Sequence, residues 1–215
     1  MTAEQTEKRA VAQAAAQLVR DGMKVGLGTG STVAELLPAL AARKLDIRCA
    51  TTSLATETTA RELGLRVETL DALGTLDIAI DGADQVAPDG WLVKGGGGAH
   101  TREKIVAGAA RRFVVIVSSN KLVDSLGPPV PLELLAFGME VTLAAVAPAA
   151  LRDVPPSPDG NPIADYLGPV GEPAVLAARL SATPGIVEHG LFPPELVGDV
   201  LVARGTEVGA LRLIA

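Results

Sequence analysis

The residues best suited to chemistry lie in one short segment, residues 94–98 with the sequence KGGGG, and in Glu103 shortly after it. Four consecutive glycines are costly to order, because glycine loses more backbone freedom on folding than any other residue. A globular chain accepts that cost where its backbone must approach a ligand closely or present N–H groups to an anion. With an ammonium group before the glycines and a carboxylate after them, the segment predicts an active site for a small anionic substrate.

Lys94 and Glu103 each have a functional and a structural interpretation. Lys94 can stabilise a developing oxyanion beside the glycines, or it can be a structural cation at the surface. Glu103 falls in the first turn of a helix predicted over residues 101–112, where a glutamate can simply complement the helix dipole. The same helix N-terminus can instead aim the carboxylate at the space above the glycines. There it can act as a base on a carbon next to a carbonyl group.

Two further carboxylates, Asp81 and Asp84, follow an apolar strand predicted over residues 76–80. Such a pair can shuttle a proton to a sugar hydroxyl or ring oxygen and position other hydroxyls. A magnesium site is a rival functional interpretation, because hard cations prefer carboxylate oxygens. The structural alternative is an Asx turn, which is common for Asp-Gly. This segment alone leaves all three open.

A glycine-rich turn at residues 26–32, with the sequence GLGTGST, joins a predicted strand to a predicted helix. It lacks the third glycine of the dinucleotide-binding pattern and the lysine of the P-loop. Its three hydroxyl groups and the N–H groups of the helix N-terminus suit one phosphate. The alternative is a tight turn in which Ser31 or Thr32 caps the helix. Lys121 follows another strand end and is a candidate for a second phosphate contact.

The elements that must position these residues alternate between strand and helix. Continuous apolar strands between helices predict an α/β fold with a Rossmann-like, mostly parallel sheet and helices on both faces. Ligands bind such sheets at the C-terminal ends of the strands, where the candidate residues stand. The predicted helices are 4–19, 33–42, 57–63 and 101–112, and the predicted strands are 23–26, 47–51, 66–70, 76–80 and 113–117. The expected buried face of the last helix consists of Ile105, Val106, Ala109 and Ala110.

The composition changes after Gly127, where three prolines within residues 128–131 mark a boundary. We expect a catalytic Rossmann-like domain of residues 1–127 with 200–215, in which two short final strands rejoin the main sheet. We expect a small α+β domain over residues 128–199. Its predicted elements are a helix or strand within 132–147, a helix over 174–180 and a strand over 186–192.

The composition is that of an ordinary globular protein, with 215 residues and a net charge of -6. The acidic balance and the 2% aromatic content argue against nucleic acid as the main partner. The most apolar long stretch, residues 141–151, is too short to span a bilayer, so no membrane partner is expected. Residues 1–9 lack the pattern of a signal peptide, and the single cysteine permits no intrachain disulfide. Cytoplasmic residence is therefore the default.

The remaining reactive residue types favour structural interpretations. His100 lies three residues before Glu103, and such a pair is more often local hydrogen bonding than a metal site. His189 falls in a predicted strand, Cys49 in an apolar strand, and Trp91 after a turn. Packing is the expected role of these three residues.

Taken together, the segments resemble ribose-5-phosphate isomerase of the A type. The shared motifs occur in the family's order and are spread over most of the chain. They are residues 28–32 (GTGST), 81–84 (DGAD), 94–97 (KGGG), 102–105 (REKI), Lys121, 184–187 (PGIV) and 190–192 (GLF). The resemblance implies interconversion of D-ribose 5-phosphate and D-ribulose 5-phosphate, in the non-oxidative pentose phosphate pathway. It implies no redox cofactor and no required metal.

The resemblance also implies a role for each matching residue. Glu103 would be the general base that moves a proton between C1 and C2 through a cis-enediolate, whose charge Lys94 would stabilise. Asp81 would assist opening of the furanose ring, and Asp84 would hold hydroxyl groups. The expected partner is a small-molecule sugar phosphate, and family members are typically homodimers or homotetramers. The residues implied in substrate binding are Lys8, Thr29, Gly30, Ser31, Thr32, Asp81, Gly82, Ala83, Asp84, Lys94, Gly95, Gly96, Gly97 and Lys121.

The chain departs from the family's pattern at three places near the predicted site. Gln85 stands where the family usually has Glu, and His100 where it usually has an apolar residue. The acid common in the loop before Lys121 is replaced by the Ser-Ser-Asn run of residues 118–120. The segment 151–161 is short, which bears on oligomer contacts more than on chemistry. No residue implied in catalysis is missing.

Two alternatives stay open. A relative on the same fold, such as a sugar-phosphate deaminase or a CoA transferase, would use the glutamate differently, although the pair Asp81 and Asp84 favours sugar hydroxyls. A sugar-phosphate-sensing domain of a transcription regulator would need a DNA-binding module, and the sequence shows no obvious helix-turn-helix extension.

Overall fold

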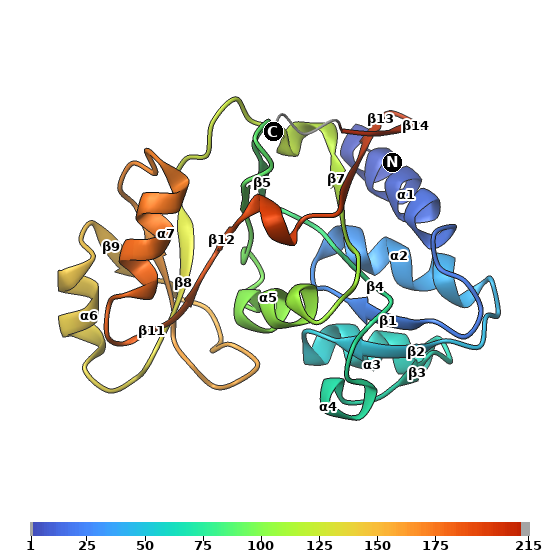
Figure 1. Ribbon diagram of the computed structural model, residues 1–215, viewed down its shortest axis with the longest axis horizontal. Helices are drawn as coiled ribbons and strands as arrows, with labels where there is room; N and C mark the ends of the chain where they lie inside the picture. The colour runs from blue at the N-terminus through green and yellow to red at the C-terminus, as the bar shows by residue number, and fades with distance from the viewer. Residues whose placement is uncertain (1, 212–215) are drawn as a thin grey trace. The chain divides into compact units, whose positions relative to one another are not determined.

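A computed structural model describes residues 2–211, which divide into two compact units (Figure 1). Of the described residues, the first unit contains 2–83, 102–121 and 195–211, and the second contains 84–101 and 122–194. The expected domains differ from these units mainly at residues 84–101, which belong with the second unit. The reason is strand pairing, because β5 (Gln85–Val86) and β6 (Leu92–Val93) form a three-stranded sheet with β12 (Leu191–Phe192). The end of the expected catalytic domain, residues 212–215, lies outside the described residues.

The first unit is built on a seven-stranded sheet with the strand order β14-β13-β7-β4-β1-β2-β3. All neighbouring strands are parallel except β13 and β14, which form an antiparallel hairpin at the edge. The two final strands therefore join the main sheet, as the sequence predicts. The strands are β1 (Lys24–Leu27), β2 (Arg48–Thr51), β3 (Arg66–Val67), β4 (Ile78–Asp81), β7 (Phe113–Ser118), β13 (Asp199–Arg204) and β14 (Glu207–Ala210).

Helices connect these strands, and side-chain caps fix where several of them begin. The Thr2 hydroxyl accepts a hydrogen bond from Gln5 N at the start of α1, and Ser53 does the same for Thr56 N at the start of α3. The strand predicted over 66–70 is wrong in its second half, because Thr69 caps a short helix there. The helices are α1 (Ala3–Ala16), α2 (Ser31–Ala41), α3 (Leu54–Glu62), α4 (Leu70–Leu73) and α5 (His100–Gly108), with short 3-10 turns η1 (Ser119–Lys121) and η2 (Pro194–Leu196).

Both faces of the sheet are covered, as expected for continuous apolar strands. Alternate strand residues enter one core with α1 and α2, namely Val25, Leu27, Ile78, Ile80, Val114 and Ile116. An intervening position, Gly26, faces α5, where a Cβ atom would lie 2.5 Å from Val106 Cγ1. The prediction that Ile105 is buried is wrong, since it is 56% exposed while Val106 and Ala107 are buried. Helix α5 also ends earlier than predicted, because Ala109 O accepts from Leu76 N beside the sheet.

The second unit contains a four-stranded antiparallel sheet with the order β11-β8-β10-β9. The region 132–147, which the sequence left open as helix or strand, contains the end of a strand and a helix. The single strand predicted over 186–192 is wrong, because β11 and β12 belong to different sheets and Gly190 lies between them. The elements are β8 (Val130–Leu134), α6 (Met139–Ala145), β9 (Ala149–Leu151), β10 (Ile163–Tyr166), α7 (Pro173–Ser181) and β11 (Ile186–His189).

Residues that the sequence analysis assigned to packing do pack. Cys49 is fully buried in the core of the first unit, and burial raises the pKa of its thiol to about 12. His189 is buried and its Nε2 lies 3.0 Å from Ser181 Oγ, while Trp91 packs against the core of the second unit. No helix within residues 2–211 is long and apolar enough to cross a membrane.

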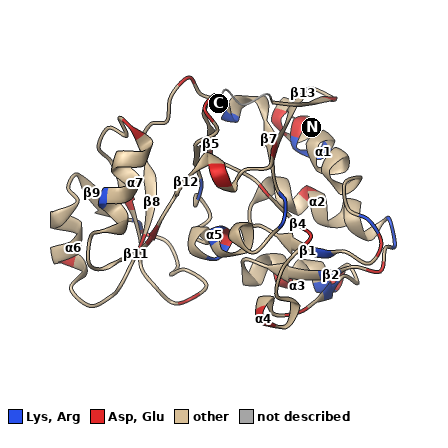
Figure 2. Cartoon of the chain, viewed as in Figure 1, with Lys and Arg blue, Asp and Glu red and all other residues tan. Residues whose placement is uncertain are grey.

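Charged residues are spread over both units (Figure 2), and one glutamate ties three elements of the first unit together. From α1, the Glu7 carboxylate accepts hydrogen bonds from Ser119 N at 2.8 Å and from Gly205 N at 3.0 Å. It also accepts from the Ser119 hydroxyl at 3.0 Å. The hydrogen bonds from Gly205 and then Ser119 lower the pKa of Glu7. Glu7 thus fixes the turn after β7 and the hairpin turn between β13 and β14 against α1.

Replacing Glu7 by Gln is expected to lower the free energy of unfolding at neutral pH and to matter less in acid. Because the folded-state pKa of Glu7 is lowered, its contribution is complete above the unfolded-state pKa of about 4.3 and is lost as the pH falls through the folded-state value. Urea unfolding of wild type and Glu7→Gln at pH 7 and in a series toward pH 3 measures this. Glu62→Gln, at the exposed end of α3, is the control. A stability difference between wild type and the Glu7→Gln variant that is constant over this range would contradict the assignment.

Candidate active site

Asp81 ends β4 and lies next to the glycine-rich turn that follows β1. Its side chain is only 3% exposed. Oδ1 accepts hydrogen bonds from Thr29 N at 3.1 Å and from Gly82 N at 2.7 Å. The parallel register places Ile80 beside Leu27, so the two strands end side by side. The sheet therefore positions a buried carboxylate at its C-terminal edge, where the sequence predicts it.

Gly28 makes this approach possible because it has no side chain. A Cβ atom at position 28 would lie 1.9 Å from the carboxyl carbon of Asp81. The turn is held from other sides as well, since Gly28 N donates to Ile80 O at 3.0 Å and Thr56 Oγ1 donates to Gly28 O at 2.9 Å. Thr29 Oγ1 lies 2.7 Å from Thr52 Oγ1. The turn at residues 28–30 is thus fixed against the ends of two neighbouring strands.

Helix α2 begins directly after this turn, and no side-chain hydrogen bond caps its N-terminus. The N-cap residue is Gly30, so the alternative in which Ser31 or Thr32 caps the helix is wrong. Ser31 is exposed and Thr32 is half-buried. The first N–H groups of a helix have no partner within the helix and carry a partial positive charge. This terminus and its hydroxyls suit an anion, and the phosphate role itself stays a prediction.

The predicted cations Lys8 and Lys121 belong to segments that the structure joins. Lys8 adjoins Glu7 on α1 and forms an ion pair with Glu4 at 2.5 Å. Lys121 ends η1, whose first residue is the Ser119 held by Glu7. The Glu4 carboxyl has a lowered pKa mainly because of Lys8, with a further contribution from Lys121. The family usually has an acid in the loop before Lys121, where this chain has the run at residues 118–120. Here Glu7 of α1 supplies a carboxylate to that loop instead.

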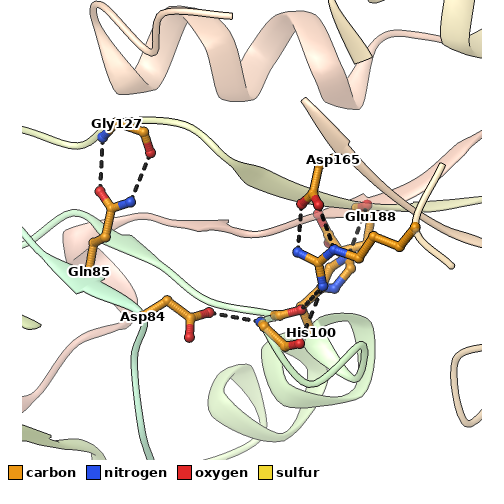
Figure 3. Close-up of polar contacts among 9 residues, drawn as sticks. Asp84, Gln85, His100, Gly127, Asp165 and Glu188 are labelled. Carbon is orange, nitrogen blue, oxygen red and sulfur yellow. Dashed lines mark hydrogen bonds and ion pairs between the residues drawn. The ribbon is translucent and has the colours of Figure 1, made fainter. Parts of the chain in front are cut away.

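In the second unit the structure brings Asp84 and the glycine loop, residues 95–98, together (Figure 3). Asp84 Oδ2 accepts a hydrogen bond from Gly96 N at 2.8 Å, and Asp84 N donates to Val93 O at 2.8 Å. A Cβ atom at position 96 would lie 2.8 Å from Asp84 Oδ1. The absence of a side chain at Gly96 is therefore what lets the carboxylate reach the loop backbone.

Lys94 enters the same loop from β6 and is buried, with 2% of its surface exposed. Its Nζ lies 5.4 Å from the centre of the Phe192 ring, a cation–π contact. Lys94 N donates to Gly190 O at 2.8 Å, and a Cβ atom at position 190 would lie 2.1 Å from Lys94 O. Gly190 therefore has to be glycine for β12 to lie against the backbone that carries Lys94.

Two departures from the family's pattern have structural roles in the second unit. The Gln85 amide donates to Gly127 O at 2.9 Å and accepts from Gly127 N at 2.8 Å (Figure 3), a pair of bonds that a carboxylate could not complete. His100 is fully buried, with Nε2 3.3 Å from Glu188 O. Within residues 2–211, no group of three or more His, Cys, Asp or Glu side chains is arranged to hold a metal ion.

Glu103 lies in the first turn of α5 and is only 4% exposed. It belongs to the first unit together with Asp81, while Asp84 and Lys94 belong to the second. The structure thus groups the candidates within each unit, and an arrangement of Glu103 opposite Lys94 stays a prediction.

The sequence analysis missed Arg152, which also contacts the glycine loop, and Asp165, which pairs with Arg152. Arg152 Nη1 donates to Gly95 O at 3.0 Å and to Gly96 O at 3.3 Å, and Asp165 pairs with the same guanidinium at 2.6 Å. Arg152 begins a proline-rich loop and Asp165 lies within a strand, so neither stands in a recognisable motif. The resemblance could have drawn attention only to residues inside the family's motifs.

A parallel sheet with a buried carboxylate at a strand end, in a chain that also buries Lys94 and Glu103, is typical of an α/β enzyme. The chain matches the family described as ribose 5-phosphate isomerase A (phosphoriboisomerase A) over residues 48–207, and the DeoR C-terminal sensor domain over residues 3–70. Ribose-5-phosphate isomerase A of Caulobacter sp. (strain K31) is 45% identical to it, over 97% of each chain. The chain belongs to the ribose-5-phosphate isomerase A family and is an isomerase.

Solved structures agree with this membership. Ribose 5-phosphate isomerase A from Methanocaldococcus jannaschii superposes with a TM-score of 0.90 at 36% identity, covering 95% of this chain and 97% of that one. A D-ribose-5-phosphate isomerase solved in complex with phospho-erythronic acid has a TM-score of 0.91 at 32% identity, covering 99% and 100%. These likenesses confirm the predicted α/β fold over nearly the whole chain.

Substituting Gly28 by Ala is expected to displace the Asp81 carboxylate, because the new methyl group would occupy its place. We expect a loss of about 10²-fold in kcat, which is typical of a catalytic group misplaced by an ångström, and a destabilisation of about 1–3 kcal/mol from overpacking. Steady-state kinetics and thermal unfolding of the purified variant measure both. Gly108→Ala is the matched control, since a Cβ atom there meets nothing within 4 Å. Full turnover by Gly28→Ala would show that Asp81 need not be held in this way.

Proposed function

We propose that this isomerase interconverts D-ribose 5-phosphate and D-ribulose 5-phosphate, with Glu103 as the base and a cis-enediolate as the intermediate. One observation carries the proposal. Among residues 2–211, the buried Asp, Glu, Lys and Arg side chains are Asp81, Lys94, Glu103 and Glu133. Charged side chains are rarely buried, and perturbed, enclosed ionisable groups cluster at functional sites. The first three are the very residues to which the resemblance assigns chemistry.

The fourth buried charged residue, Glu133, has a structural explanation, which sharpens the contrast. Glu133 Oε1 accepts hydrogen bonds from Ser157 Oγ at 2.7 Å and from Asn161 Nδ2 at 2.8 Å. Its Oε2 accepts from Thr101 Oγ1 at 2.5 Å. These neutral donors satisfy the carboxylate and join β8, the loop at 157–161 and the start of α5. Glu133 therefore has a structural role within the second unit.

The proposed reaction begins with the sugar in its ring form. Asp81 accepts the proton of the anomeric hydroxyl and passes it to the ring oxygen as the C1–O4 bond breaks, which gives the open-chain aldehyde. The Glu103 carboxylate then removes the proton from C2, and the electrons shift onto the carbonyl oxygen to give the enediolate. Lys94 stabilises this negative charge, and Asp84 holds the hydroxyl groups. The proton of the C2 hydroxyl then passes to the oxygen on C1, and Glu103 returns its proton to C1, which yields the ketose with no net loss of electrons.

The phosphate would bind at the start of α2 through residues 29–32, with Lys121 and Lys8 as further contacts. The uncapped helix N-terminus supports this role, because it presents N–H groups and a favourable dipole to an anion. A related isomerase has been solved with phospho-erythronic acid, a phosphorylated sugar acid. A phosphate anchored away from the reacting carbons supplies binding energy that can be used for positioning.

A second candidate function is sensing without turnover. The match of residues 3–70 to the DeoR C-terminal sensor domain favours it, since this segment contains the α2 N-terminus. A sensor would bind a sugar phosphate there and would not need buried charges at positions 94 and 103. Cytoplasmic location, a place in the pentose phosphate pathway, and a homodimeric or homotetrameric state all stay predictions.

Purified protein is expected to convert ribose 5-phosphate into ribulose 5-phosphate in the presence of a chelator and without added cofactor. Proton transfer between adjacent carbons needs only acid and base groups, which the chain supplies. Proton NMR of the sugar mixture over time measures the approach to equilibrium from either side. Folded protein that binds ribose 5-phosphate yet leaves it unchanged would favour the sensor and reject the isomerase proposal.

Glu103→Gln is expected to lower kcat by about 10²–10⁴-fold, the usual contribution of a positioned general base. Substrate binding should persist, because the amide keeps the size of the side chain and the phosphate contacts lie elsewhere. Single-turnover kinetics and calorimetric titration with ribose 5-phosphate separate the two effects. Near-normal turnover by this variant, with Glu62→Gln as the control, would place the base at another residue.

A further inference from the structure

The glycine loop is held from one side by a half-buried ion pair that no motif predicts. Arg152 follows β9, and Asp165 lies in the middle of the four-stranded sheet on β10; their side chains are 15% and 18% exposed. Arg152 Nε and Nη2 each donate to one oxygen of Asp165 at 2.6 Å. The remaining nitrogen, Nη1, donates to the carbonyl oxygens of Gly95 and Gly96 (Figure 3).

Asp165 is itself fixed by the sheet. It pairs with Pro131 of β8 on one side and with Ala150 of β9 on the other. A planar guanidinium bonded at two points to such a carboxylate has little freedom left, so its third nitrogen points in a set direction. A lysine ammonium could contact the carboxylate or the carbonyls but lacks this rigid fork.

The orientation of two carbonyls determines the orientation of two N–H groups. The only cis peptide bonds within residues 2–211 precede Pro129 and Pro148, so the glycine peptides are trans. In a trans peptide the C=O and the following N–H point in opposite directions. With the Gly95 and Gly96 carbonyls turned to Arg152, the N–H groups of Gly96 and Gly97 face away from it. The Gly96 N–H does so, and reaches Asp84 Oδ2 at 2.8 Å.

The loop needs such a restraint because its own sequence gives it none. Gly95 and Gly98 have φ values of +103° and +71°, and glycine runs have the largest backbone freedom of any sequence. One bond within the loop, from Gly98 N to Gly95 O, closes a turn but leaves the central peptide planes able to rotate. Arg152 on one side and Asp84 on the other remove that rotation.

We propose that Arg152, oriented by Asp165, is a positioning residue for the isomerase reaction. It sets the peptide planes that follow Gly95 and Gly96. It thereby directs the Gly96 N–H to Asp84 and the Gly97 N–H to the same side of the loop as Asp84. The role in turnover rests on the proposed function, in which Asp84 and residues 95–97 contact the sugar. The mechanical part, the ordering of the loop by the guanidinium, does not depend on which sugar binds.

The first test measures the loop directly. In protein labelled with ¹⁵N-glycine, Arg152→Lys is expected to speed hydrogen exchange of the Gly96 amide by about tenfold or more, because its bond to Asp84 loses its restraint. Arg179→Lys is the matched control, since Arg179 also donates to a backbone carbonyl, that of Ala145, in the same unit. Unchanged exchange at Gly96 in a folded Arg152→Lys variant overturns the proposal whether or not the protein is an isomerase.

The second test measures turnover with ribose 5-phosphate. Arg152→Lys and the milder Asp165→Asn are expected to lower kcat by about 10-fold to 10²-fold, while inhibition by inorganic phosphate, which the first unit would bind, stays at its wild-type value. Millimolar guanidinium chloride should restore part of the kcat of Arg152→Ala, and ammonium chloride should not. A variant that loses only thermal stability and keeps kcat and Gly96 exchange would make the ion pair purely structural and overturn the positioning role. Absence of turnover by wild type would instead reject the proposed function.

Discussion

The carboxylate of Asp81, buried where β4 and β1 end side by side, is the contact on which the first unit's site depends. It accepts one hydrogen bond from an N–H in the turn after β1 and one from the N–H directly after its own strand. The loops that follow these two strands are therefore bonded to the same carboxylate. The contact exists only because position 28 has no Cβ atom. The start of α2 follows at once, and its orientation is therefore fixed by the same interaction. The carboxylate that we propose for proton transfer and the helix terminus that we propose for phosphate binding are thereby held by one constraint.

In the second unit, other residues have to order the glycine loop, because the loop has no side chains of its own. Asp84 accepts a hydrogen bond from an N–H of the glycine loop, and Arg152 donates hydrogen bonds to two of its carbonyl groups from the other side. Lys94 is fixed at the loop's start by its bond to Gly190 and by the ring of Phe192. Glycine thus supplies close approach, and charged side chains supply the order that glycine lacks.

Much of this could be predicted from the sequence, and the failures have physical causes. Local patterns identified the parallel sheet, the turn at residues 26–32 and the burial of Cys49, because apolar runs and glycine spacing depend on neighbours in the chain. The face of α5 was misjudged at Ile105, since apolar character at helical spacing does not say which of several adjacent residues meets the sheet. The roles of Glu7, Arg152 and Asp165 depend on partners far away in sequence. No local signal marks such residues, and a family motif does so only for positions that touch substrate.

Gly190 shows how one residue can limit the exchange of whole segments. Its N–H donates to Pro131 O in the larger sheet of the second unit, while its C=O accepts from Lys94 N in the smaller one. Both sheets are therefore hydrogen-bonded to the backbone of this one residue. A chimaera that replaces residues 128–189 with a longer or shorter module must keep both hydrogen bonds of Gly190 in register. Otherwise Lys94, whose N–H is bonded to Gly190, is displaced. We therefore expect changes in the length of this region to be tolerated in its outer loops and not at the crossing from β11 to β12.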